Sequence, residues 1–376
     1  MSLRYILGAA VLVGLPFGAA MAADDIEPCD GCANSMTVVS WGGAYQTSQQ
    51  NAYSKPYAEL TGTTFTWDES SNEAVAKLRA QFEAGNVTWD LVDVEGPDSQ
   101  RLCDEGLAMP IDFDAVLAPG DDGSTPTADF GDGLINECFI PQIWFSTTFG
   151  YRTDVAEWNG AVPTSLCDVF DMQKFPGKRA LEKRPKKNLE WALLCDGVTK
   201  EELYDVLSTP EGVDRALKKL DTIKDQTVWW SAGAEAPQLL ADKEVVFGST
   251  YNGRLFAVIE EQHQPVAMLW DYEVFDFDGW IVPADLPEDR KARVMNFLRF
   301  ATDTQRLADQ AKWISYGPAR ASSQPLVGKH ADLGIEMAPH MPTNPDNMKN
   351  YLVNNIEWWA DHQDEVEAKF QAWLTQ

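Results

Sequence analysis

The chain has 376 residues, of which 58 are Asp or Glu and 30 are Lys or Arg, so its formal net charge is −28. Nucleic acids and anionic lipids are bound through clustered lysines and arginines, and so large a negative excess argues against both as partners. The composition is ordinary for a globular protein. A chain of this length exceeds one comfortable hydrophobic core, which favours about two domains.

The N-terminus has the pattern of a secretory signal peptide. Arg4 precedes an apolar run over residues 6–15, and Ala20-Met21-Ala22 supplies an Ala-x-Ala cleavage site. The run is too short to anchor the chain in a bilayer. We therefore expect residues 1–22 to be removed and the mature protein to lie in the periplasm. Because Cys29 follows several polar residues later, a free form is expected rather than a lipid-anchored one.

Six cysteines remain in the mature part, and an even number in an oxidising compartment favours disulfides. The expected pairs are Cys29–Cys32, Cys103–Cys138 and Cys167–Cys195. The run Cys29-Asp30-Gly31-Cys32 also fits a redox or zinc site, but no second pair of this kind exists and no helix starts behind it.

The first part of the chain alternates between strand and helix patterns. The apolar periodicity predicts strands over residues 36–41, 63–67 and 89–94, and helices over residues 44–60 and 71–82. This alternation is typical of a parallel α/β sheet, which binds ligands beyond the carboxyl ends of its strands. Residues 41–45 and 95–98 should therefore face one cleft.

A second α/β unit follows in the middle of the chain. Strands are predicted over residues 245–250 and 279–282, and helices over residues 189–194, 200–207, 210–223, 252–261, 287–300 and 347–374. The sequence contains no long flexible linker between the two units. Two α/β lobes without a disordered tether predict a hinged clamshell.

The sequence lacks the usual motifs of catalysis. It has no Gly-x-Ser-x-Gly elbow, no His-x-x-x-His pair and no phosphate-binding glycine loop, and its four histidines are dispersed in polar or helical contexts. No enzyme activity, cofactor or metal is expected. The alternatives from other classes are a secreted hydrolase with two carboxylates and a structural envelope protein.

Aromatic residues are the stronger signal, because several of the 14 tryptophans fall near predicted strand ends. Aromatic faces attract weakly hydrated cations such as quaternary ammonium or sulfonium groups. Ordinary packing remains the alternative for any single ring. The rings in such places are Trp41, Trp144, Trp229, Trp230, Trp270 and Trp280, with Tyr45, Tyr251 and Tyr316.

A basic run stands out in this acidic chain, with Lys178, Arg179, Lys183, Arg184, Lys186 and Lys187 close together. A solvated patch is the simple interpretation. The alternative is that one or two of these side chains, or Arg254, hold a ligand carboxylate, which a guanidinium grips with paired hydrogen bonds.

Six segments match a known family in their order along the chain. They are residues 38–45, 89–92, 144–154, 189–194, 248–253 and 278–283. With them the chain resembles the extracellular solute-binding proteins related to spermidine/putrescine-binding proteins. The resemblance covers the whole mature chain. It implies a type II-like periplasmic binding protein that delivers a solute to the permease of an ABC importer. We expect lobe 1 to comprise residues 36–143 and 254–305, and lobe 2 to comprise residues 144–253 and 306–376.

The resemblance also assigns residues to the cleft. Trp41, Tyr45 and Tyr251 match cleft aromatics, and Asp278 matches an acid that pairs with a ligand amine. The family's acids for a far amine correspond to the lysine run and to Arg254, which disfavours a polyamine.

We therefore expect a zwitterion of the betaine or dimethylsulfoniopropionate type, with putrescine or spermidine as the alternative. Glu95 and Asp278 would face its cation and Arg254 its carboxylate. The aromatic walls would be Trp41, Tyr45, Trp229, Trp230, Tyr251 and Trp280. A monomer is expected.

Overall fold

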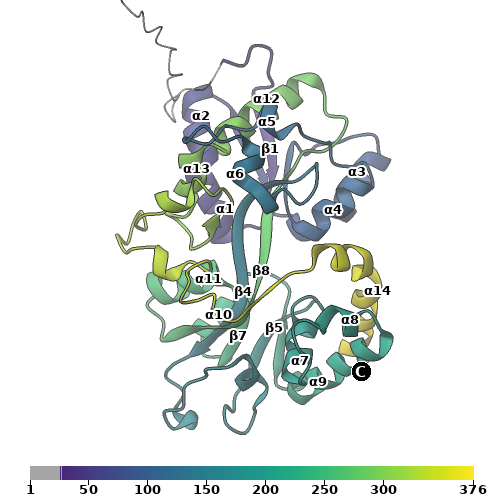
Figure 1. The fold of residues 1–376 in the computed structure, drawn as a ribbon, viewed down its shortest axis with the longest axis vertical. Helices are drawn as coiled ribbons and strands as arrows, with labels where there is room; N and C mark the ends of the chain where they lie inside the picture. The colour runs from purple at the N-terminus through teal and green to yellow at the C-terminus, as the bar shows by residue number, and fades with distance from the viewer. Residues whose placement is uncertain (1–25, 27) are drawn as a thin grey trace, which may run out of the picture.

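The computed structural model describes residue 26 and residues 28–376, which form two lobes joined by two long strands (Figure 1). Strands β4 (Ile140–Arg152) and β8 (Val266–Ile281) run antiparallel from the upper part of the molecule into the lower part. The predicted two-lobed α/β fold is confirmed. The expected signal peptide, residues 1–22, lies outside the described residues.

Ten strands of the described residues form one sheet, in the order β2-β1-β3-β8-β4-β7-β5-β6, with β9 on β4 and β10 on β8. Parallel pairing joins β1 to β2 and β3 at one end of this order, and β5 to β6 and β7 at the other. The strands besides β4 and β8 are β1 (Ser35–Val39), β2 (Thr64–Asp68), β3 (Leu91–Glu95), β5 (Arg179–Glu182), β6 (Thr227–Trp230), β7 (Phe247–Tyr251), β9 (Gly317–Pro318) and β10 (Tyr351–Val353).

The pairing of β4 with β8 breaks between the lobes. Thr147 pairs with Val274, but Phe149 pairs with Leu269, so the register shifts at this point. The sequence predicted only the last residues of β8 as a strand. The remainder escapes a periodicity analysis because its interior carries acids that the fold buries, among them Glu273.

Helices of the upper lobe surround β1, β2 and β3 (Figure 1). They are α1 (Gly43–Gln49), α2 (Lys55–Thr61), α3 (Ala74–Glu83), α4 (Gly96–Asp104), α5 (Phe113–Val116), α6 (Pro126–Phe130), α12 (Glu288–Ala301) and α13 (Thr304–Gln310). The helix predicted over residues 44–60 is found as α1 and α2 joined by a π-helical turn, Gln50–Ser54.

The lower lobe contains α7 (Asn188–Cys195), α8 (Leu203–Leu207), α9 (Pro210–Lys224), α10 (Glu235–Ala241), α11 (Asn252–Phe256) and α14 (Ile356–Leu374). Helix α14 begins nine residues later than the start predicted at residue 347, because the chain first forms β10 on β8. Short helical turns occupy Ser71–Glu73, Gly131–Gly133, Ala156–Trp158, Leu166–Phe170, Ala257–Glu261, Gln324–Leu326 and Ala338–His340.

Each lobe has its own apolar core. The upper core includes Tyr53, Tyr57, Leu91, Trp280 and Phe297. The lower core includes Phe149, Trp191, Leu217, Phe247 and Phe370. Separate cores allow each lobe to remain packed while the strands between them bend. The lobe boundaries expected from the sequence stay a prediction.

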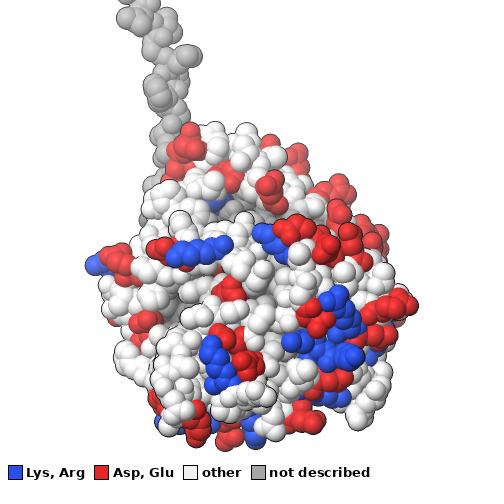
Figure 2. Space-filling model, turned by 60° about the horizontal axis from the view of Figure 1, so that its bottom comes forward, with Lys and Arg blue, Asp and Glu red and all other residues white. Residues whose placement is uncertain are grey.

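All three expected disulfide pairings are confirmed: Cys29–Cys32, Cys103–Cys138 and Cys167–Cys195. Across the part of the chain that the structure describes, no helix is both long and apolar enough to cross a bilayer. Figure 2 shows acidic side chains scattered over the face that it presents, with the largest group of Lys and Arg on its right side and further basic side chains on its left. On this face the acidic charge therefore forms a dispersed, solvated surface.

Candidate ligand-binding site

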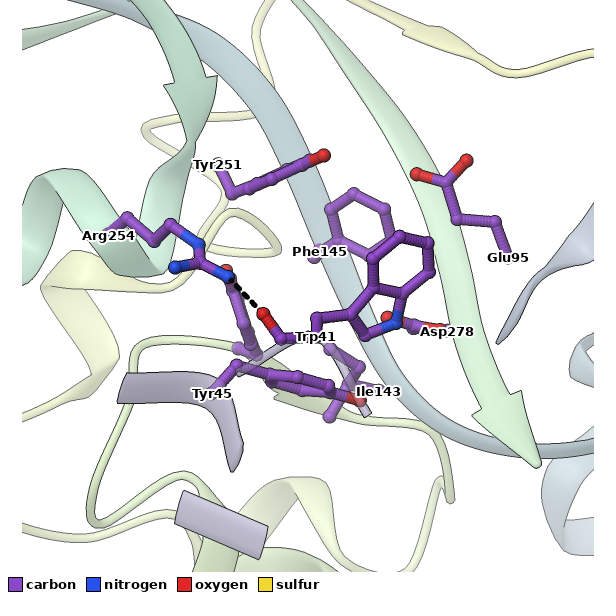
Figure 3. A pocket seen from close by; sticks show the side chains of 9 residues that line it. Trp41, Tyr45, Glu95, Ile143, Phe145, Tyr251, Arg254 and Asp278 are labelled. Carbon is purple, nitrogen blue, oxygen red and sulfur yellow. Dashed lines mark hydrogen bonds between the residues drawn. The ribbon is translucent and has the colours of Figure 1, made fainter. Parts of the chain in front are cut away.

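A cavity of about 280 Å³ lies where the first turn of α1, the ends of β3 and β7, and the two long strands meet (Figure 3). It is lined by Trp41, Tyr45, Glu95, Ile143, Phe145, Tyr251, Arg254, Asp278 and Tyr316. Six of the nine predicted ligand-binding residues are in this set. The volume of about 280 Å³ counts all the space between these side chains, including space that is open to solvent.

A buried pair of carboxyl groups lies at one side of the cavity, which Asp278 lines and Asp93 supports. Asp93 on β3 and Asp278 on the neighbouring β8 are 0% and 6% exposed. Tyr45 donates a hydrogen bond to Asp93 at 3.0 Å, and its hydroxyl lies 2.7 Å from the amide oxygen of Gln142. Burial raises the pKa of Asp93 to about 6. Burial, together with the charge of Asp93, raises the pKa of Asp278 well above its usual range. A bound cation would let both acids ionise.

Arg254 on α11 stands on another side of the cavity, away from Asp278 (Figure 3). Its guanidinium is buried, donates to the main-chain carbonyl of Trp41 at 3.3 Å and lies 5.7 Å from the ring of Tyr251. Its Nε has no hydrogen-bond partner, and no acid of the described residues forms an ion pair with it. A buried cation with open donor positions is a site for a carboxylate.

Glycine at position 43 gives this guanidinium its space. The backbone φ of Gly43 is +59°, in the left-handed region that side chains rarely adopt. A Cβ there would lie 3.1 Å from a terminal nitrogen of Arg254. The Trp41-Gly42-Gly43 turn therefore brings the main chain of the upper lobe against an arginine of α11.

Glu95 differs from its expected role of facing a ligand cation. Its carboxylate contacts the ammonium of Lys186, and the ammonium of Lys187 lies 3.4 Å from its other oxygen. Burial would raise the pKa of Glu95, but the charges of Lys186, Lys187 and Arg184 outweigh burial and hold its pKa well below the usual range. The negative charge of Glu95 is therefore already balanced by the protein's own lysines.

The aromatic walls come from both lobes. The ring of Tyr45 packs edge-on against Tyr316 at 5.7 Å, and Phe145 packs edge-on against Tyr251 at 5.6 Å. Figure 3 shows the indole of Trp41 extending beside the carboxyl of Asp278. A cation paired with this carboxyl would therefore also contact an aromatic face, which adds to its attraction.

Three predicted aromatics do not reach the cavity. Trp229 packs edge-on against Trp373 of α14 at 5.6 Å. Trp230 is 1% exposed and bonds a backbone carbonyl of β7, and Trp280 packs against Tyr53 in the upper core at 5.4 Å. A place near a strand end does not distinguish a ring that faces the cavity from one that packs in the core, because large rings at such ends also cover the sheet.

Sequence reasoning also missed residues that line or support the cavity. Ile143 and Phe145 lie on β4, and Asp93 with Gln142 forms the polar layer beneath Tyr45. A signal existed for Asp93, because an acid between two valines of a buried strand needs a buried polar partner. Among the described residues no group of His, Cys, Asp and Glu side chains is arranged to hold a metal ion.

This chain resembles known solute-binding proteins. Residues 52–343 match the family model of bacterial extracellular solute-binding proteins. The γ-aminobutyric acid (GABA)-binding protein of Pseudomonas aeruginosa is 36% identical over 363 residues, 96% of this chain and 95% of that protein. A solved GABA receptor is 32% identical with a TM-score of 0.75, over 91% of this chain and 98% of the receptor. A periplasmic binding protein of Agrobacterium tumefaciens B6 in complex with glucopine is 28% identical with a TM-score of 0.78, over 90% of this chain and 99% of that one.

Proposed function

Because the chain belongs to the bacterial extracellular solute-binding proteins, the non-enzymatic substrate-binding components of ABC importers, we propose that it captures a small ω-amino acid of the GABA type. The ligand ammonium would lie against Asp278 and Asp93, beside the rings of Trp41 and Tyr45. The ligand carboxylate would lie against Arg254. The closed cleft would then hold one zwitterion between the two lobes.

One observation carries this proposal: the buried guanidinium of Arg254 and the buried carboxyl group of Asp278 line one cavity, and among the described residues neither forms an ion pair with another side chain. Leaving either charge buried and unpaired is unfavourable, and a zwitterion pairs both at once. Arg254 and Asp278 stand apart across the cavity in Figure 3, which favours charges at the two ends of a short chain over charges on adjacent atoms.

The named relatives support the same choice. Two proteins described as GABA-binding match nearly the whole chain at 36% and 32% identity. An ω-amino acid is a zwitterion, as the sequence predicted for the ligand. Its cationic group is an ammonium, whereas the predicted ligands carry a quaternary ammonium or sulfonium group. An ammonium can donate hydrogen bonds to Asp93 and Asp278, whereas betaine and dimethylsulfoniopropionate cannot, so these rank second.

A polyamine fits less well. Its second ammonium would approach Arg254, and two like charges about 4 Å apart repel by about 4 kcal/mol at an effective dielectric of about 20. No acid of the described residues pairs with Arg254 to offset that repulsion. Putrescine and spermidine are therefore the third choice.

Calorimetric titration tests the proposal. We expect saturable binding of GABA, weaker binding of betaine and dimethylsulfoniopropionate, and little binding of alanine or putrescine. Arg254→Met should weaken GABA binding by about 2–4 kcal/mol, or about 30- to 1000-fold, because the ligand carboxylate loses its partner. The control is Arg215→Met, an exposed arginine paired with Asp196 on the lower lobe. Tight putrescine binding, or full GABA affinity after Arg254→Met, would refute the proposal.

The remaining expectations about cellular context are part of the proposal. Export by a signal peptide into the periplasm, release of the solute to the permease of an ABC importer and a monomeric state all fit the family. Mass measurement of the exported protein tests the cleavage after Ala22. Light scattering with and without GABA tests the monomeric state.

A further inference from the structure

Lys187 places a cation of the protein's own against two aromatic rings that line the cavity. Its ammonium lies 5.4 Å from the ring centroid of Phe145 and 5.5 Å from that of Tyr251, two rings that line the cavity. The same ammonium bonds Glu95, and the side chain is 2% exposed. These rings and this carboxylate are the groups that a second ligand cation would need.

The backbone at Lys187 is held in a strained form. Its φ is +75° and its ψ is −42°, a combination that non-glycine residues rarely adopt. Lys187 precedes α7 but makes no side-chain cap to that helix. Strain of this kind persists where the surrounding structure fixes a residue, and it occurs often at ligand sites. Here it accompanies a lysine whose ammonium reaches the rings and Glu95 instead of solvent.

The ammonium stays charged in this position. Burial would lower the pKa of Lys187, but the charges of Glu95, Glu182 and Asp276 raise it above its usual range. Lys186 bonds the other oxygen of Glu95 and lies 4.0 Å from Asp276. Removing Lys187 would therefore leave Glu95 with one ion-pair partner among the described residues and would take the cation away from the faces of Phe145 and Tyr251.

We propose that Lys187 is a specificity residue that occupies the place of a second ligand cation and so excludes diamines, while it tolerates a ligand that ends in a carboxylate. The inference rests on the proposed ω-amino acid function and names the residue that sets its charge preference. Arg254 attracts the carboxylate. The ammonium of Lys187 occupies the ring faces of Phe145 and Tyr251 and the carboxylate of Glu95, which would otherwise accept a ligand ammonium.

The test compares GABA with putrescine, which carries an ammonium in place of the carboxylate. Both are titrated calorimetrically into the full-length mature protein, its Lys187→Met variant and its Lys187→Arg variant. Lys187→Met should raise the affinity for putrescine about tenfold or more and lower that for GABA, because like-charge repulsion inside a binding site is strong. Lys187→Arg keeps the charge and should keep the exclusion. Lys183→Met, an exposed lysine of the same run, should change neither affinity by more than about twofold.

An unchanged ratio of putrescine to GABA affinity in Lys187→Met would overturn the inference, since a merely structural lysine would not move that ratio. Failure of wild-type protein to bind GABA would instead refute the proposed function, and the putrescine gain would still decide the role of Lys187. If Lys187→Met fails to fold, Lys187→Gln removes the charge while keeping a donor for Glu95. The same gain for putrescine is expected there, and its absence would count against the inference.

Discussion

Asp93 on β3 and Asp278 on the neighbouring strand β8 form a buried pair of acids, and burial together with the charge of Asp93 holds the pKa of Asp278 well above its usual range. Two carboxylates in contact cannot both ionise in a buried setting unless a cation joins them. In the free protein a proton on one of the two acids prevents both from being charged at once. In the bound protein the ligand ammonium would take its place, so binding and proton release are linked.

Ligand affinity should therefore rise with pH. The pKa of Asp93 is about 6 and that of Asp278 lies well above its usual range, so the free pair retains a proton at neutral pH. A bound ammonium favours the ionised pair. The association constant for GABA should increase by about one log unit per pH unit above about pH 6, and should level off above the pKa of Asp278. Calorimetry in buffers of different ionisation enthalpy should show release of about one proton per ligand.

Asp278→Asn is the control for that linkage. It removes the proton donor but leaves Asp93, so binding should weaken and its pH dependence above about pH 6 should disappear. The ammonium of GABA does not titrate in this range, since alkyl ammonium groups have pKa values of about 10. A pH-independent affinity in the wild-type protein would show that the pair does not receive the ligand cation.

Trp41 and Trp229 were both predicted from the sequence to line the ligand cleft, but their substitution should have different effects on affinity and stability. Trp41→Leu should weaken GABA binding by about 1–2 kcal/mol with little change in melting temperature, because this partly exposed ring faces the cavity. Trp229→Leu should lower the free energy of unfolding by about 2–3 kcal/mol and leave affinity unchanged, because its ring packs on Trp373 of α14. Thermal melts and titrations of both variants give the comparison, and equal loss of affinity would contradict it.

A structural feature of this protein can be predicted from the sequence when it depends on residues that are close together in the chain. It cannot be predicted when it depends on residues that meet only in the folded structure. Strands β1, β2 and β3 follow from alternating strand and helix patterns, and the turn after β1 carries Trp41 to the cavity. Those features depend on local sequence. Strand β8 does not follow, because its buried acids find partners on other elements, as Asp276 does with Asn354 at 2.6 Å.

The same division explains the site. Tyr45 and Asp278 were assigned to the cleft by the family resemblance, and Arg254 was proposed as the partner of a ligand carboxylate. The structure brings these three residues to one cavity. The state of Glu95 was not predictable, since its charge depends on two lysines some 90 positions later in the chain. The type of a residue and its place in the chain thus indicated which side chains line the cavity. Contacts between residues far apart in the sequence decide which of the charged side chains lack an ion-pair partner in the protein.

The three disulfides should contribute unequally to stability. Cross-linking restricts the unfolded chain more when the closed loop is longer. Cys103–Cys138 and Cys167–Cys195 close separations of 35 and 28 residues, whereas Cys29–Cys32 closes three. Paired serine substitutions should cost about 4 kcal/mol at either long loop and about 2 kcal/mol or less at the short one. Denaturant unfolding of each double variant measures this, and equal losses would indicate that loop closure is not the cause.

Glu273 should make the protein less stable as pH rises. This side chain of β8 is completely buried, and burial raises its pKa from 4.5 to about 8. In the unfolded chain the carboxyl ionises near its ordinary pKa, so between about pH 4.5 and 8 ionisation favours the unfolded state by about 1.4 kcal/mol per pH unit. The stabilisation present below that range is lost as pH rises through it. Above about pH 8 both states are ionised and this dependence ends.

Glu273→Gln isolates that contribution, because an amide of the same shape does not titrate. The variant should gain stability relative to the wild-type protein as pH rises from about 5 to about 8, by a few kcal/mol in total. Glu83→Gln, at an exposed position of α3, should show no such gain. Urea unfolding at several pH values measures the difference. A gap between the Glu273→Gln and wild-type curves that stays constant with pH would mean that folding does not raise the pKa of Glu273, and would contradict this prediction.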